Sequence, residues 1–170
     1  GDLLWWLKGN HNLNLKLAEM EQAGKLSAIV TQNIDGLHQA AGSKNVFELH
    51  GSVHRNYCQK CGKFFDVNYV VNAKGVPYCD ECGGIIKPDV VLYEEGLDSQ
   101  TINGAVRAIS KADMLIIGGT SLVVYPAAGM IDYFKGKYLA VLNRDATSRD
   151  KQADLCITDP IGEVLGRIRV

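Results

Sequence analysis

Residues 31–38 read Thr-Gln-Asn-Ile-Asp-Gly-Leu-His, and residues 48–51 read Glu-Leu-His-Gly. Two cysteine pairs follow, Cys58 with Cys61 and Cys79 with Cys82. Amide and carboxylate side chains, histidines and four thiols therefore share one stretch of the chain, residues 31–82. We interpret the thiols as a structural metal site and the polar residues before them as the carriers of the chemistry.

The cysteines follow the pattern Cys-x2-Cys, seventeen residues, Cys-x2-Cys. Each pair is followed by a glycine, Gly62 or Gly83, where a tight turn favours a residue without a Cβ atom. Two such turns predict a closed tetrahedral shell of four thiolates, which suits zinc and leaves no open position for a substrate. Four unliganded core cysteines and an iron site are the alternatives. The fifth cysteine, Cys156, lies in an apolar run and is expected to be a small buried residue.

Composition and charge exclude several classes of protein. Of the 170 residues, 46% are hydrophobic and 22% charged, which is typical of a globular protein with a real core. The formal net charge of -1 predicts neither a nucleic-acid nor a membrane partner. No apolar run reaches the ~20 residues of a transmembrane helix, and no signal peptide is visible. Paired cysteines without a leader indicate a reducing compartment, and we predict the cytoplasm.

Short apolar segments alternate with segments of helical spacing. This alternation predicts an α/β fold with a mostly parallel sheet. Between residues 53 and 87 the apolar periodicity gives way to cysteines, lysines and glycines, which predicts a small metal-centred module inserted into a larger domain of residues 1–52 and 88–170. The predicted strands are residues 26–31, 46–49, 89–93, 114–117, 138–142 and 155–158, and the predicted helices are residues 13–20, 99–109, 126–134 and 161–168, with a short helix within 33–41.

Ligands of parallel α/β sheets bind beyond the carboxyl ends of the strands. Three segments lie at the carboxyl ends of predicted strands: residues 31–35, His50 and residues 118–121. We therefore expect three loops to converge on one crevice. Asn33 and Asp35 can hydrogen-bond the two ends of a carboxamide. The same two residues are equally typical of a loop that caps the next helix, and His50 can be a core or capping histidine.

These motifs resemble the signature of the sirtuins, which are NAD-dependent protein lysine deacylases. The resemblance covers residues 13–170. It includes residues 31–38 and 48–51, Ala-Gly-Ser at 41–43, the cysteine quartet, Lys-Pro-Asp-Val-Val at 87–91, Gly-Thr-Ser-Leu at 119–122 and Leu-Asn-Arg at 142–144.

The resemblance implies a Rossmann-like, mostly parallel sheet with an inserted small zinc-ribbon module. It implies one structural Zn²⁺ per chain, NAD as co-substrate and acylated-lysine proteins or peptides as partners. The expected products are the deacylated lysine, nicotinamide and O-acyl-ADP-ribose.

Functional residues carry over position by position. His50 matches the catalytic histidine, which acts as a general base. Val90, Val91 and Tyr93 resemble the segment on which the acyl-lysine peptide aligns as an added strand. The metal ligands are Cys58, Cys61, Cys79 and Cys82, and the residues that match NAD contacts are Gln32, Asn33, Asp35, Gly119, Thr120, Ser121, Asn143 and Ile161.

Two departures from the family pattern have consequences for function. The family usually shows Phe-Gly-Glu where this chain has Tyr93, Glu94 and Glu95, which leaves acyl and peptide preference open. The family's glycine-rich segment, Gly-Ala-Gly-x-Ser, which wraps the NAD phosphates, has no counterpart here. We therefore expect a Rossmann-like domain without its first strand and an impaired enzyme. A protein ADP-ribosyltransferase, and an impaired module that binds NAD metabolites or peptides, are the alternatives.

Overall fold

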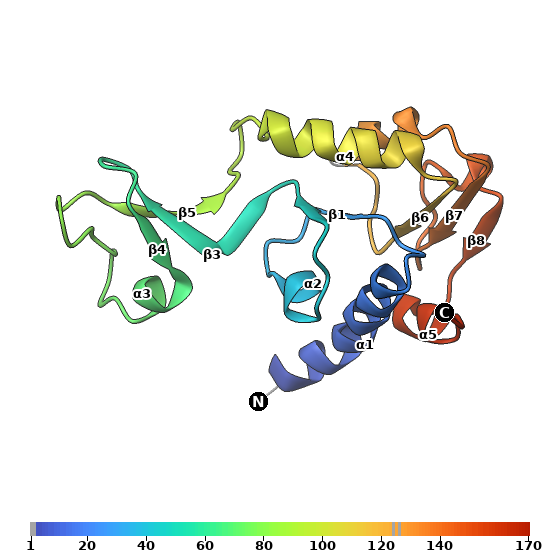
Figure 1. The fold of residues 1–170 in the computed structure, drawn as a ribbon, viewed down its shortest axis with the longest axis horizontal. Coiled ribbons are helices and arrows are strands. Elements are labelled where there is room, and N and C mark those ends of the chain that lie inside the picture. Colours follow the sequence, from blue (N-terminus) through green and yellow to red (C-terminus); the bar gives the residue numbers. More distant parts are fainter. Residues whose placement is uncertain (1–2, 124, 126) are drawn as a thin grey trace. The chain divides into compact units, whose positions relative to one another are not determined.

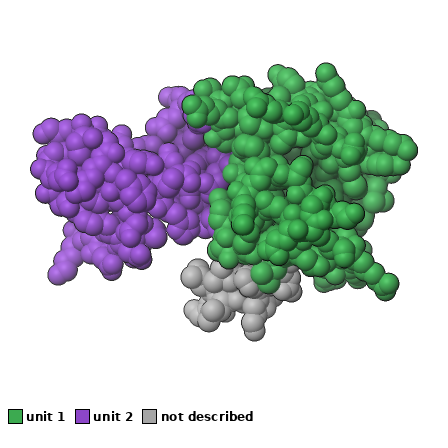
Figure 2. Space-filling model, in the orientation of Figure 1, with its two compact units in different colours: residues 1–30, 37–47, 99–170 green, residues 31–36, 48–98 purple. Residues whose placement is uncertain are grey.

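The structure, a computed structural model, describes residues 3–123, 125 and 127–170. The chain divides into two compact units (Figure 2). Unit 1 contains residues 1–30, 37–47 and 99–170, and unit 2 contains residues 31–36 and 48–98. Residues 53–87, predicted as the metal module, all belong to unit 2. No helix among the described residues combines the length and the apolar character needed to cross a bilayer.

Unit 1 is built on a parallel three-stranded sheet in the order β6-β7-β8 (Figure 1). The strands are β6 (Met114–Gly118), β7 (Tyr138–Leu142) and β8 (Leu155–Ile157). β7 is the central strand, and its last four residues are buried because it has a neighbour on each edge. The prediction of an α/β fold with a parallel sheet is therefore confirmed in this unit.

Side chains of β7 alternate between two apolar clusters, as the two-residue period of a strand requires. Ala140 and Leu142 pack with Leu165 of helix α5 (Ile161–Gly166) and with residues of α1 (Leu3–Gln22). Leu139 and Val141 pack in a separate cluster that includes Ile131 of the 3-10 helix η1 (Ala127–Tyr133). The sheet thus buries apolar side chains on both faces.

The helices of unit 1 differ from their predictions mainly in length. Helix α1 begins at residue 3 rather than 13, and it ends before Gly24, whose φ of 69° is the glycine stop that the sequence indicated. Residues 127–133 form a 3-10 helix, while residue 126 of that prediction lies outside the described residues. The remaining elements are α2 (Leu37–Ala40), α4 (Ser99–Lys111) and the 3-10 helix η2 (Asp150–Gln152).

Two short strands, β1 (Ile29–Thr31) and β2 (Val46–Glu48), form a two-stranded sheet. Both were predicted, and both are shorter than predicted. Each leads from residues of unit 1 into residues of unit 2. The last residue of each strand, Thr31 or Glu48, is therefore the first residue of a unit 2 segment and also the first residue of a polar motif.

Unit 2 contains an antiparallel sheet in the order β4-β3-β5, which the sequence did not predict. The strands are β3 (Gly51–Cys58), β4 (Phe64–Asp66) and β5 (Ile86–Val90). β3 mixes histidine, arginine and asparagine with small residues, so it carries no clear apolar alternation. β5 replaces the strand predicted at 89–93. A short helix follows β4, α3 (Val67–Val71), whose first turn is capped by the Asp66 carboxylate at 2.9 Å from the Tyr69 N–H.

Candidate functional site

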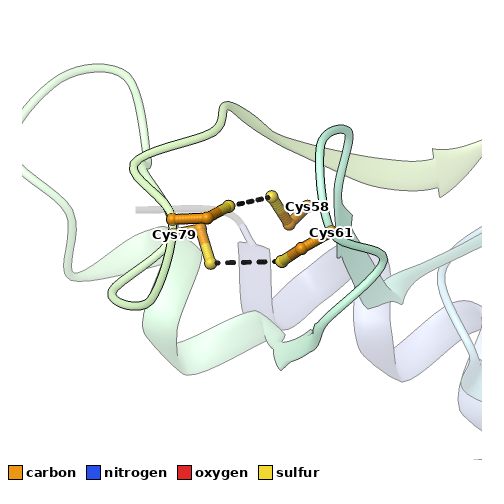
Figure 3. Close-up of side chains that lie close together, drawn as sticks. Cys58, Cys61 and Cys79 are labelled. Atoms are coloured by element: carbon orange, nitrogen blue, oxygen red, sulfur yellow. Dashed lines mark hydrogen bonds between the residues drawn. The ribbon is translucent and has the colours of Figure 1, made fainter.

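Four cysteine side chains converge at one end of the antiparallel sheet of unit 2 (Figure 3). Their Sγ atoms all lie within 4.8 Å of one another. The Sγ atoms of Cys58 and Cys82 are 3.4 Å apart, and those of Cys61 and Cys79 are 3.7 Å apart. Four sulfurs around a zinc ion at ~2.3 Å would be separated by ~3.8 Å along each tetrahedral edge. The donor set and its spacing therefore fit a closed Zn²⁺ site.

Both cysteine pairs sit in turns with the same backbone hydrogen bonds. Gly62 and Gly83 end these turns with φ angles of 74° and 67°, as the spacing predicted. Gly84 must also lack a side chain, because a Cβ atom there would lie 2.7 Å from the Cys58 sulfur. The matching bonds are Cys58 N–H to Lys63 O (2.9 Å), Gly62 N–H to Cys58 O (2.9 Å), Cys79 N–H to Gly84 O (2.8 Å) and Gly83 N–H to Cys79 O (3.0 Å).

Contacts between the thiols shift the pKa values of Cys58 and Cys61 in opposite directions. Burial acts to raise the pKa of Cys58, but backbone hydrogen bonds from Cys61 and Lys60 and contacts with the other thiols outweigh it, lowering this pKa to about 6. A backbone hydrogen bond from Lys63 acts to lower the pKa of Cys61, but contacts with the Cys82 thiol, together with burial, raise it to about 12. A divalent cation removes this conflict by stabilising all four thiolates, and its binding releases protons.

A lysine connects the two cysteine turns. Lys63 Nζ lies 2.7 Å from an Asp80 carboxylate oxygen and 2.8 Å from a Glu81 carboxylate oxygen. The hydrogen bond from Lys63 lowers the pKa of Asp80. The sequence did not predict this pairing, although a lysine after one Cys-x2-Cys and an acidic pair inside the other are its signal.

His50 lies in the turn between β2 and β3, two residues after Glu48. Its Nδ1 atom is 3.1 Å from the carbonyl oxygen of Gln32. Because a carbonyl oxygen only accepts, Nδ1 carries the proton in this contact and donates it. The other ring nitrogen, Nε2, then keeps its lone pair and can accept a proton. The half-buried imidazole is therefore held in the tautomer that a general base requires.

Residues 31–36 pack against residues 49–54 through the backbone. Leu49 N–H donates to Thr31 O at 2.9 Å, and Val53 N–H donates to Ile34 O at 3.1 Å. The Thr31 hydroxyl also accepts the Asn33 N–H at 3.0 Å, which fixes the first turn of the loop. These bonds bring the three predicted nicotinamide-pocket residues of this loop, Gln32, Asn33 and Asp35, into the same unit as His50.

Gly36 is the second constraint on this loop. Its φ is 67°, and a Cβ atom there would lie 2.6 Å from the His54 ring. The His54 ring in turn places Nε2 at 2.9 Å from the Asp35 carbonyl oxygen. A side chain at residue 36 would force the His54 ring away from its contact with the Asp35 carbonyl oxygen, and the positive φ by itself favours glycine.

The segment predicted to align the substrate runs beside the His50 turn. Val91 N–H donates to the His50 carbonyl oxygen at 3.0 Å, and Val90 lies opposite Gly51 in the β3–β5 register. A Cβ atom on Gly51 would lie 1.8 Å from the Asp89 carbonyl oxygen, so only glycine permits this approach. Tyr93, further along the segment, is fully exposed.

Glu94 holds the position at which the sirtuin pattern has glycine. Its φ is 70°, in the left-handed region that glycine adopts without strain. Glu95, the next residue, stabilises this turn. Its carboxylate accepts a hydrogen bond from the Leu92 N–H at 2.9 Å and forms an ion pair with Lys87 at 3.2 Å. The hydrogen bond from Leu92, with the Lys87 contact, lowers the pKa of Glu95. The turn therefore keeps a glycine-like backbone but presents a carboxylate.

The other predicted NAD contacts lie in unit 1, at the carboxyl ends of β6 and β7 and at the start of α5. The Gly119 N–H donates to Leu142 O at 3.2 Å, and the Asn143 N–H donates to Ile157 O at 3.0 Å, which ties the loops after these strands together. Ile161, at the start of α5, packs so closely on Gly118 that a Cβ atom there would lie 2.2 Å from its Cδ1 atom. Gly119, Thr120, Ser121, Asn143 and Ile161 thus form one group.

Comparison with known proteins identifies the family. Residues 6–126 match the Sir2 family. The chain belongs to the Sir2 family. It is 67% identical over 150 residues to the NAD-dependent protein deacetylase of Clostridium acetobutylicum, covering 88% of this chain and 61% of that protein. It is 64% identical over 159 residues to the NAD-dependent protein deacetylase of Clostridium perfringens, covering 93% and 65%.

Solved Sir2 structures share the fold of this Sir2-family chain. A complex of Sir2 with a p53 peptide and NAD+ is 38% identical, with a TM-score of 0.85 over 92% of this chain and 67% of that one. A Sir2 structure bound to an acetylated peptide is 37% identical, with a TM-score of 0.85 over 92% and 68%. The chain spans less than two thirds of the length of the two deacetylases named above.

One sequence prediction about this Sir2-family chain is wrong. Cys156 was expected to be buried, but it is exposed, and its thiol lies 3.6 Å from the Asp150 carbonyl oxygen. β8 is at the edge of the described sheet, so only β7 covers it along one side. An apolar run therefore does not bury its cysteine there.

Proposed function

We propose that this chain catalyses the NAD-dependent removal of acetyl and other acyl groups from protein lysines, giving nicotinamide and O-acyl-ADP-ribose. The observation that carries the proposal is the His50 turn. An imidazole whose Nδ1–H is held by the Gln32 carbonyl lies next to the half-buried segment of Val90 and Val91, which is bonded to the His50 turn through the Val91 N–H. Relatives 67% and 64% identical are named NAD-dependent protein deacetylases, which supports the same reaction.

Two groups of residues would hold NAD. When bound, NAD+ supplies the ribose carbon that accepts the acyl oxygen as nicotinamide leaves, and water completes the transfer of the acyl group to ADP-ribose. Asn33 and Asp35 have the amide and carboxylate groups that pair with the two ends of a carboxamide. Gly119 has a φ of 63°, and a Cβ atom there would meet no other atom within 4 Å, so its loop leaves room for a ligand. The proposed contacts are Gln32, Asn33, Asp35, Gly119, Thr120, Ser121, Asn143 and Ile161.

His50 would act as the general base. Its Nε2 atom takes the proton from the ribose hydroxyl that attacks the acyl carbon, and the imidazole becomes an imidazolium. The carbonyl of Gln32 accepts the Nδ1–H throughout, so it both orients the ring and stabilises the positive charge. A backbone group therefore fixes the tautomer, and no acidic side chain is needed for it.

The acyl-lysine peptide would bind as an added strand. β5 is an edge strand of the described sheet β4-β3-β5, so its outer backbone groups can pair with an extended peptide. Val90 and Val91 would lie along that peptide while the Val91 N–H stays bonded to the His50 carbonyl oxygen, and the fully exposed Tyr93 would contact the peptide beyond them. The partners are therefore proteins or peptides that carry acylated lysines.

The four cysteines would hold one structural Zn²⁺ per chain. Because four thiolates complete a tetrahedral shell, the metal offers no site to substrate and stabilises the module of residues 53–87. The NAD-binding domain would then be residues 1–52 and 88–170. Since a four-thiol metal site persists best in a reducing compartment, we place the protein in the cytoplasm.

Mass spectrometry of an acetylated peptide, incubated with the protein and NAD+, tests the proposal. Deacetylation with release of nicotinamide supports it. A gain of ADP-ribose on a protein would instead indicate an ADP-ribosyltransferase, and no change with measurable NAD binding would indicate a binding module. A parallel incubation with His50→Ala shows whether the observed reaction depends on the proposed base.

A further inference from the structure

Arg55, on β3, bridges two acidic residues from separate segments of unit 2. Its Nη1 atom lies 2.6 Å from a Glu48 carboxylate oxygen, and its Nε atom lies 2.8 Å from an Asp89 carboxylate oxygen. The Glu48 side chain is only 8% exposed, whereas the side chains of Arg55 and Asp89 are 39% and 45% exposed. A planar guanidinium can hold two carboxylates in fixed directions at once, which a single ammonium does less well.

The backbone places Arg55 where it can reach both partners. In the pairing of β3 with β5, the register changes between Ser52 and Asn56: Ser52 lies opposite Asp89, and Asn56 lies opposite Pro88. The residues between them, including Arg55, therefore bulge out of the pairing with β5, while Arg55 stays opposite Asp66 of β4. Proline has no N–H to donate, so Pro88 suits a point at which the ladder is interrupted.

Each acidic partner lies two residues before a residue that has a role in the proposed reaction. Glu48 precedes His50, and Asp89 precedes Val91. The two segments also meet directly, because the Val91 N–H donates to the His50 carbonyl oxygen at 3.0 Å. Arg55 therefore joins the segment that carries the general base to the segment that would align the peptide.

We propose that Arg55 is a positioning residue that fixes the register between the His50 turn and the peptide-aligning strand. It does not touch the reacting atoms. By holding Glu48 and Asp89 together it keeps the Val91–His50 bond formed and sets the distance from the bound acyl-lysine to the His50 ring. The catalytic role of Arg55 rests on the proposed deacylase reaction. Its effect on the Val91–His50 hydrogen bond can be measured without that reaction.

A simpler role for Arg55 would be to neutralise a buried charge. Removing Arg55 alone would leave the Glu48 carboxylate buried without its partner, which is destabilising in itself. The double variant Glu48→Gln/Arg55→Met separates the two roles, because it removes the guanidinium and the buried charge together. If Arg55 only neutralises charge, the double variant behaves like the wild type.

Amide hydrogen exchange of Val91, measured on the zinc-loaded protein by NMR, reports how often the Val91–His50 hydrogen bond opens. Both Arg55→Met and the double variant lose the hydrogen bonds from Arg55 to the two acidic residues, so the Val91–His50 hydrogen bond should open more often. We therefore expect hydrogen exchange of the Val91 N–H to accelerate roughly tenfold or more in both variants. The Cys58 N–H, which donates to Lys63 O at 2.9 Å in the same unit, should keep its wild-type rate. Arg149→Met is the matched control, because Arg149 pairs with Asp132 at 2.6 Å in unit 1.

Steady-state kinetics with an acetylated peptide measures the effect of Arg55 on peptide binding and turnover. We expect the KM for peptide to rise roughly tenfold in Arg55→Met and in the double variant, with the KM for NAD+ little changed. Two results would overturn the proposal. One is a Val91 exchange rate in Arg55→Met that equals the wild-type rate; the other is a double variant in which both the Val91 exchange rate and the KM for peptide return to wild-type values. If Val91 exchange accelerates but the wild-type protein deacetylates no peptide, the link stands and it is the proposed function that fails.

Discussion

Replacing Cys79 by alanine should unfold the metal-centred part of unit 2. The change leaves three thiolates and one open coordination position, and Cys79 is itself a buried residue of the local apolar cluster. That cluster has four buried members, Cys58, Phe65, Cys79 and Ile86, so two of its four are proposed metal ligands. Little apolar packing is left to hold this part together once the metal is lost.

The size of the effect follows from the metal site and the size of the unit. A structural zinc contributes about 10–16 kcal/mol in small zinc-binding peptides, or roughly 3 kcal/mol for each of four ligands. A unit of about sixty residues has a net stability of only ~3–9 kcal/mol. Loss of one ligand is therefore comparable with the whole free energy of unfolding of unit 2.

The assay pairs metal analysis with urea unfolding followed by circular dichroism. Cys156→Ala is the matched control, because Cys156 is exposed and lies outside the cluster. We expect one zinc per chain and unchanged unfolding in the control, and weak zinc retention with an early unfolding transition in Cys79→Ala. A wild-type protein without metal after chelator-free purification, or a Cys79→Ala variant that keeps both zinc and stability, would refute the reasoning.

Three further predictions concern the catalytic turn and the loop beside it. His50→Ala should lower the deacetylation rate by about 10²–10⁴ with an unchanged circular dichroism spectrum, and it should affect nicotinamide exchange less; full activity in the variant would contradict the assignment. Gly51→Ala should be strongly destabilising, because its Cβ would lie 1.8 Å from a backbone oxygen; Gly24→Ala, also at positive φ but with no atom within 4 Å, should be milder, and equal unfolding midpoints would show that space is not the cause. Glu95→Gln should lower stability at neutral pH but not in acid. The Leu92 N–H and a lysine depress the pKa of Glu95, so its contribution is present above the unfolded pKa and lost as pH falls through the folded one; a difference in unfolding free energy that does not vary with pH would be inconsistent with this.

Local spacing was sufficient to predict which four cysteines cluster and to predict most of the strands. Two Cys-x2-Cys turns with a glycine after each specify their own backbone geometry, so the positive φ angles of Gly62 and Gly83 follow from a few neighbouring residues. β6 and β7 were recognised in the same way from their own continuous apolar runs, and in β7 the last four residues of that run are buried.

The antiparallel sheet of unit 2 was not predictable in this way. β3 contains histidine, arginine and asparagine, and its bulge depends on Pro88, more than thirty residues further along the chain. The error at Cys156 has a related origin, because burial at a sheet edge depends on what covers the strand and not on the residues beside it.

The sequence by itself determined the family resemblance, the four thiolates and the identity of the proposed base. Only the tertiary structure decided how that base is held. The His50 tautomer depends on the Gln32 carbonyl, 18 residues away, and the Arg55 bridge depends on Asp89, 34 residues away. Sequence patterns record the conformational preferences of neighbouring residues, whereas these contacts form only when the folded backbone brings distant segments within hydrogen-bonding distance.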